Sequence, residues 1–203
     1  MILVIWPLGK EAKDIRNWLF RLFMYTAAST LGAATLALLL GLVGRGLYLL
    51  FPATPLQWLV GLLGVVSILY ALHELNIIRL PNPQKGWLVP KSWQRWGRMV
   101  GNTLYGYVLG MGIFTYIPFG SFYLLLMWEL VAGMFSLKAA VLLGVIYGFS
   151  RGLPAILGGI SMLRDQYPLP VTNWLTVRLG LWHAINGVVL MLIGGFLLGT
   201  LIL

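Results

Sequence analysis

The sequence contains no cysteine, and only 5 of its 203 residues are aspartate or glutamate. The absence of thiols excludes disulfides, thiol redox chemistry and thiolate metal sites. The few acids form no paired carboxylates, and the chain has no serine–histidine–acid set, HExxH motif or phosphate-binding loop. We therefore expect a protein that is not an enzyme.

Charge is scarce in general, because only 9% of the residues are charged, against about 25% in soluble domains. Hydrophobic residues make up 60% of the chain, which predicts an all-α integral membrane protein with a single polytopic membrane domain over residues 1–203. We expect about five transmembrane helices. They are the segment between Arg21 and Arg45, Leu56–Leu75, Val100–Gly133, Ala139–Ile160, and Leu179 to the C-terminus.

The basic residues predict the orientation of these helices. Most of them lie in residues 1–20 and in the loop 76–99, and the positive-inside rule places both segments in the cytoplasm. The protein is then a multi-pass protein of the plasma (inner) membrane, with a cytoplasmic N-terminus and an outside C-terminus. The net charge of +9 therefore indicates membrane topology and no nucleic-acid partner.

The third hydrophobic segment is uncharged from Met99 to Trp128 and contains Pro118 and Gly120. It is too long for one straight crossing of a hydrocarbon core about 30 Å thick and too short for two. Proline also disrupts the preceding helical turn. We expect a helix broken at Pro118, with an unwound segment that needs cover from a partner subunit or a second copy. Its candidate substrate or pathway residues are Thr115, Tyr116, Pro118 and Gly120.

Charged residues inside the predicted membrane region are further pathway candidates. Arg151 is expected near the midplane of the fourth helix, Glu129 nearer the outer side, and Glu74 near the inner end of the second helix. Arg151 either forms a static pair with Glu74 or Glu129, extends toward the headgroups, or selects or gates an anion. The sequence does not choose among these interpretations.

The two histidines, His73 and His183, are expected at similar depth near the inner ends of two helices. This arrangement suits a haem, a chlorophyll-type pigment or a metal shared with Glu74. The alternative, which needs no cofactor, is a pair of interfacial or hydrogen-bonded histidines.

Two features predict contact surfaces. The basic loop combines tryptophans with lysines and arginines in a short amphipathic pattern, which indicates contact with anionic lipids or docking of a partner. Its basic residues are Lys85, Lys91, Arg95 and Arg98. Glycines four residues apart also predict close helix packing. These pairs are Gly106 and Gly110, Gly144 and Gly148, and Gly195 and Gly199.

The order of these elements resembles the CcdA-like proteins and the membrane domain of DsbD, within the group that includes LysE-type exporters. The segments that carry the resemblance are Arg79–Pro81, Gly110–Pro118, Gly144–Pro154 and Gly187–Leu198. The resemblance implies a degenerate inverted repeat. The chain departs from that family in two ways, because it lacks the cysteines of the thiol relay and the first helix of the first repeat.

Three functions follow in order of preference. The first is a non-catalytic subunit, a scaffold or assembly partner in a larger membrane complex, of CcdA-like origin and without cofactor. The second is a secondary transporter or exporter of a small solute that uses residues 115–120 and Arg151, as a homodimer. The third is an electron-transfer or pigment subunit that binds its cofactor through His73 and His183.

Overall fold

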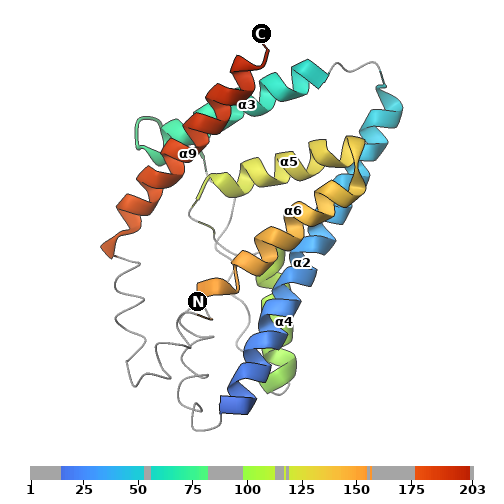
Figure 1. Cartoon of the computed structure of the whole chain (residues 1–203), viewed down its shortest axis with the longest axis vertical. Coiled ribbons are helices and arrows are strands. Elements are labelled where there is room, and N and C mark those ends of the chain that lie inside the picture. Colours follow the sequence, from blue (N-terminus) through green and yellow to red (C-terminus); the bar gives the residue numbers. More distant parts are fainter. Residues whose placement is uncertain are drawn as a thin grey trace. The chain divides into compact units, whose positions relative to one another are not determined.

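The computed structural model describes residues 15–52, 56–81, 98–112, 117, 119–154, 156 and 177–201. Within this part of the chain the regular structure is entirely helical (Figure 1). Its six helices are α2 (Ile15–Leu50), α3 (Leu56–Glu74), α4 (Arg98–Met111), α5 (Ser121–Phe135), α6 (Leu137–Ser150) and α9 (Leu179–Gly199). The all-α prediction is therefore confirmed for the described residues.

Three of these helices, α2, α3 and α9, are long and apolar enough to cross a membrane. The third expected crossing is broken, as predicted, and the fourth is not a single long helix either. The third is divided into α4 and α5, of 14 and 15 residues, and the fourth ends at Ser150 after the 14 residues of α6. At 1.5 Å per residue, each of these helices is only about 21–23 Å long. The helix at the N-terminal end is longer than expected, because α2 continues past both Arg21 and Arg45.

The break in the third segment begins at a glycine. Gly112 follows the last residue of α4 with a φ of 71°, and its N–H donates to Leu109 O at 3.1 Å. A left-handed glycine directly after the last turn is a common helix terminator. The expected break is therefore present, although the helix ends before Pro118. Thr115, Tyr116 and Pro118 lie outside the described residues.

The chain divides into two compact units, each made of three sequence segments. The first unit comprises residues 1–35, 86–116 and 144–178, and the second comprises 36–85, 117–143 and 179–203. In the first unit, Trp18, Leu22, Tyr25 and Leu109 form a buried cluster between α2 and α4. A Cβ on Gly106 would lie 2.6 Å from Tyr25 O, so glycine allows these two helices to approach closely.

In the second unit, α3 packs along α9 and also contacts α5. The buried side chains of Leu63, Leu124 and Leu190 join these three helices. Ser67 adds a polar link, since its hydroxyl donates to Leu190 O at 2.7 Å. A hydroxyl bonded to the backbone of a neighbouring helix is a favoured way to bury a polar side chain among apolar helices.

The predicted glycine faces are partly correct. Gly106, Gly110 and Gly148 lie against the backbone of α2 within the first unit. On α9, Gly195 and Gly199 have open space where a Cβ would project, so they do not pack against another described helix, and their alternative role as a docking face stays a prediction. Gly187 and Gly194 face α3 instead, so the small-residue face of α9 lies on a different side of the helix.

Two polar residues set helix ends in the second unit. Asn76, with a φ of 59°, terminates α3, and the N–H groups of Asn76 and Ile77 donate to His73 O and Leu72 O at 3.0 and 2.9 Å. These two bonds form a Schellman motif. Ser136 ends α5, and its hydroxyl accepts from Ala139 N at 3.3 Å in the first turn of α6.

Candidate functional site

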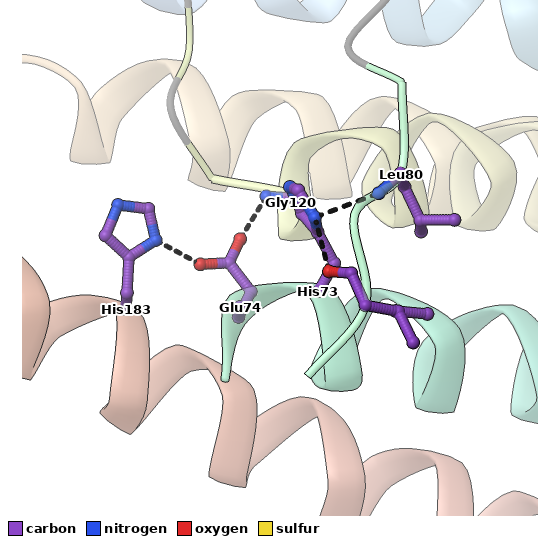
Figure 2. A network of polar contacts seen from close by, with 6 residues as sticks. His73, Glu74, Leu80, Gly120 and His183 are labelled. Carbon is purple, nitrogen blue, oxygen red and sulfur yellow. Dashed lines mark hydrogen bonds and ion pairs between the residues drawn. The ribbon is translucent and has the colours of Figure 1, made fainter. Parts of the chain in front are cut away.

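The polar centre of the second unit is Glu74, the last residue of α3. Its side chain is fully buried, with an exposed fraction of 0%. One carboxylate oxygen accepts the backbone N–H of Gly120, and the other contacts Nδ1 of His183 (Figure 2). A buried carboxylate must be paired and hydrogen-bonded to be tolerated. Glu74 meets this requirement on both oxygens.

These contacts join the ends of three helices that lie far apart in the sequence. Gly120 precedes the first residue of α5, so its N–H belongs to the positive end of that helix, where a carboxylate is stabilised. His183 lies in the first turns of α9. We call Glu74, Gly120 and His183 the Glu74 centre. It fixes the C-terminus of α3 to the N-termini of α5 and α9.

Glycine is required at position 120 by the close approach of α3. A Cβ there would lie 2.5 Å from Cδ1 of Tyr70 and 3.2 Å from Oε1 of Glu74. The ring of Tyr70 is stacked on Tyr123 at 5.7 Å, and the ring of His183 lies 4.8 Å from that of Phe119. Aromatic rings therefore surround the pair, and the break in the chain is covered at Gly120 by the protein's own helices.

Only one edge of the His183 ring is engaged by Glu74. Nδ1 faces the carboxylate, and the side chain is 24% exposed. An imidazole held through one nitrogen by a carboxylate presents its other nitrogen, Nε2, as an acceptor or a ligand. This is the arrangement in the described chain that best suits proton exchange or ligand binding.

His73 does not share this centre. Its Nδ1 accepts the N–H of Leu80 at 3.1 Å and lies 3.4 Å from Ile78 O (Figure 2). A neutral ring that accepts at Nδ1 carries its proton on Nε2, which is then unable to bind a metal. The two histidines have different partners, and the described residues contain no group of three or more His, Cys, Asp or Glu side chains able to hold a metal ion.

Arg151 occupies a different setting from the expected one. It lies in the turn after α6 rather than inside a long helix, and it belongs to the first unit. Its Nη1 donates to the hydroxyl of Tyr147 at 2.7 Å, while its Nε is buried with no hydrogen-bond partner among the described residues. Glu74, one of its two expected partners, binds His183 and Gly120 instead.

Glu129, the other pathway candidate, lies on α5 in the second unit. Its side chain is only 2% exposed, and Oε2 has no hydrogen-bond partner in the described part of the chain. Lys85, Lys91 and Arg95 of the predicted docking loop lie outside the described residues, whereas Arg98 is the first residue of α4. Among the predicted site residues that the structure describes, it brings together Gly120 and His183.

From the sequence, Glu74 was expected only as a partner for Arg151 or for a metal. One signal pointed to its pairing with His183, because both residues lie near the inner ends of predicted helices. Tyr147 was also missed as a partner of Arg151, although the two residues are four apart and such pairs share a helix face.

No family model and no solved structure matches the chain. It is 31% identical to the methylamine utilization protein MauF of Paracoccus versutus over 170 residues, which are 83% of this chain and 59% of that protein. It is 28% identical to MauF of Methylobacillus flagellatus over 170 residues, which are 83% of this chain and 58% of the relative. It is 29% identical to MauF of Methylorubrum extorquens over 194 residues, which are 95% of this chain and 65% of the relative.

These relatives overturn the resemblance to the CcdA-like and DsbD proteins. They are named MauF, and no family model supports a CcdA-like origin. The inverted repeat therefore loses the support of that resemblance. The chain spans less than two thirds of the length of each of these relatives. Over most of its own length, the chain is similar to the methylamine utilization protein MauF.

Proposed function

We propose that this protein is a non-catalytic membrane subunit that serves methylamine utilization as an accessory protein. The observation that carries the proposal is its similarity to MauF proteins across 83–95% of its length in three of them. The name of these relatives supports a role in methylamine utilization. The apolar helices and their buried polar contacts support the role of a non-catalytic membrane subunit.

Membrane insertion is supported by the outward faces of α3 and α9. Trp58 on α3 is 75% exposed, and Phe196 and Leu192 on α9 are 73% and 68% exposed. Large apolar side chains exposed along helices long enough to span a bilayer are suited to contact with lipid chains. We propose a multi-pass protein of the inner membrane with a cytoplasmic N-terminus.

The non-catalytic role is supported by how the Glu74 centre is built. Both carboxylate oxygens of Glu74 are engaged by the ends of other helices, so the group holds the fold together rather than facing a substrate. The remaining exposed apolar faces suit other membrane subunits or a second copy of the chain. Such a partner is expected to contact the outward faces of α3 and α9, where large apolar side chains are exposed.

Deleting the gene from its host tests the process. Growth with methylamine as the sole carbon or nitrogen source is expected to fail, while growth on a substrate without methylamine continues, and reintroducing the full chain restores it. Normal growth of the deletion strain on methylamine would contradict the proposal. Affinity purification from gently solubilised membranes is expected to recover stable partner subunits, and recovery of the isolated chain alone would count against a subunit role.

A second candidate is transport of a small solute. It is favoured by buried polar atoms that lack partners among the described residues, Nε of Arg151 and Oε2 of Glu129. Transport by the isolated chain in liposomes, lost in Arg151→Gln, would favour this candidate over the subunit role.

A further inference from the structure

The surroundings of Arg151 in the first unit contain several hydrogen-bonding groups. The hydroxyl of Tyr147, one turn earlier on α6, accepts a hydrogen bond from Nη1 of Arg151. The guanidinium also lies over the Tyr147 ring, with its Cζ 5.7 Å from the ring centroid. Tyr25 on α2 and Tyr105 on α4 lie within electrostatic range of Arg151 and stack on each other at 6.4 Å. Three helices therefore bring tyrosines to one arginine.

Thr26 adds an unsatisfied hydroxyl to this cluster. Its side chain is 8% exposed, and Oγ1 is buried without a hydrogen-bond partner in the described residues. The hydroxyl lies against Gly152, the neighbour of Arg151, because a Cβ on Gly152 would be 2.7 Å from it. Burying a hydroxyl without a partner is unfavourable, which favours a site that is completed by a ligand.

The turn that carries Arg151 is held firmly against α2. The Ser29 hydroxyl donates to Gly148 O at 3.0 Å, and the side chain of Thr26 fills the space beside Gly152. The backbone N–H groups of Arg151 and Gly152 bond back to Tyr147 O and Phe149 O at 3.1 and 2.9 Å. The arginine therefore projects from an anchored turn, and a ligand meets a preorganised site.

Among the described residues of the first unit, the positive charge of Arg151 has no acidic side chain to balance it. Arg151 has Tyr147 as its only hydrogen-bond partner among the described residues, and the described acids, Glu74 and Glu129, belong to the other unit. A half-buried guanidinium is stable when an anion or a set of hydrogen-bond acceptors completes it. Since Nη1 is taken, the edge formed by Nε and Nη2 remains, and this edge binds two oxygens of one anionic group side by side.

We propose that Arg151, Thr26, Tyr25 and Tyr105 bind a phosphate group. The N–H groups of the guanidinium edge donate to two phosphate oxygens, and the hydroxyls donate to the others. Phosphate suits the cluster better than a carboxylate, because it offers more oxygens to this number of donors. The group belongs either to free phosphate or to a lipid headgroup, and binding does not depend on the proposed role in methylamine utilization.

Thermal unfolding of the full chain tests the proposal. The protein is delipidated in dodecyl maltoside, which carries no phosphate, and unfolding is followed by tryptophan fluorescence. Inorganic phosphate at tenfold its Kd is expected to raise Tm by about 3–6 °C relative to sodium chloride of equal ionic strength. If phosphatidylglycerol micelles raise Tm and free phosphate does not, the ligand is a lipid headgroup. No increase with either, or an increase with acetate alone, would overturn the proposal.

Variants assign the effect to this cluster. Arg151→Gln is expected to abolish the phosphate response, whereas Arg45→Gln is expected to keep it. Arg45 is a matched control, because it also lies near a tyrosine ring, 5.7 Å from that of Tyr48, but its Nη1 donates to Met134 O at 3.1 Å. A phosphate response that persists in Arg151→Gln would show that the anion binds elsewhere.

Thr26→Val keeps the test decisive if Arg151→Gln does not fold. Valine has nearly the shape of threonine and removes only the unpartnered hydroxyl. Without phosphate this variant is expected to be at least as stable as the natural protein, and its phosphate-induced rise in Tm is expected to be smaller. A variant that is less stable without phosphate but keeps the full response would contradict the assignment of Thr26.

Discussion

Glu74 and His183 lie 109 residues apart in the sequence, and their side chains are joined by a hydrogen bond at the meeting point of α3 and α9. Because Glu74 is fully buried, the removal of its carboxylate leaves the His183 ring and the Gly120 N–H without their acceptor. The pair is therefore expected to dominate the stability of the second unit.

Glu74→Ala is expected to lower the free energy of unfolding by about 3 kcal/mol or more, the range for breaking a buried pair from one side. Glu74→Gln is expected to cost less, because its amide oxygen can still accept one of the two bonds. Denaturant titration in micelles measures both. Combining Glu74→Gln with His183→Gln in a double-mutant cycle is expected to give a coupling energy of about 0.5–3 kcal/mol, and strictly additive losses would show that the side chains do not interact.

Glu129 is the matched control for Glu74, since both carboxylates are buried in the same unit. Oε2 of Glu129 has no partner among the described residues, so replacing the carboxylate with an amide removes an unfavourable charge without breaking a described bond. Glu129→Gln is expected to leave Tm unchanged or higher. A fall in Tm similar to that of Glu74→Gln would mean that Glu129 has an essential partner.

Adjacent glycines on α9 provide a test of helix packing. A Cβ on Gly194 would lie 2.7 Å from Cγ1 of Ile68 and 2.8 Å from Gly64 O, whereas Gly195 has open space. Gly194→Ala is expected to destabilise the protein by about 1–3 kcal/mol through overpacking. Gly195→Ala is expected to be neutral or to stabilise by up to about 1 kcal/mol. Equal effects at both positions would contradict the described contact between α3 and α9.

The histidines predict the absorption of the purified protein. The proton on Nε2 of His73, required by the bond from Leu80 to Nδ1, prevents this ring from binding iron. We therefore expect no visible band from a haem or pigment that is bound through both histidines. His73→Phe is expected to cost about 1 kcal/mol of stability through loss of that bond. A visible band that disappears in His73→Phe would restore the electron-transfer or pigment interpretation.

Helix ends marked by local signals were the most predictable part of the fold. The second helix was predicted at Leu56–Leu75 and the last was predicted to start at Leu179, and the structure differs by only one residue at the end of α3. Prolines before α3 and Asn76 after it act within a few residues, so the sequence alone reveals them. The apolar stretch after Ala139 carries no comparable signal near Ser150, so the end of α6 at that residue was not predicted.

The candidate sites were less predictable, because they depend on which helices pack together. The position of Gly120 at a break followed from Pro118 and from the length of the uncharged stretch. Its bond to Glu74 depends on the approach of α3 to α5, which no local pattern specifies. The cluster around Arg151 has the same origin, since Tyr25 and Tyr105 reach it from two other helices.

Ser136 both ends α5 and caps α6, so no spacer residue separates the two helices. A residue inserted or deleted at this junction would rotate α6 by about 100° about its axis relative to α5. Chain-length changes are therefore expected to be poorly tolerated at this junction, even where single substitutions are harmless.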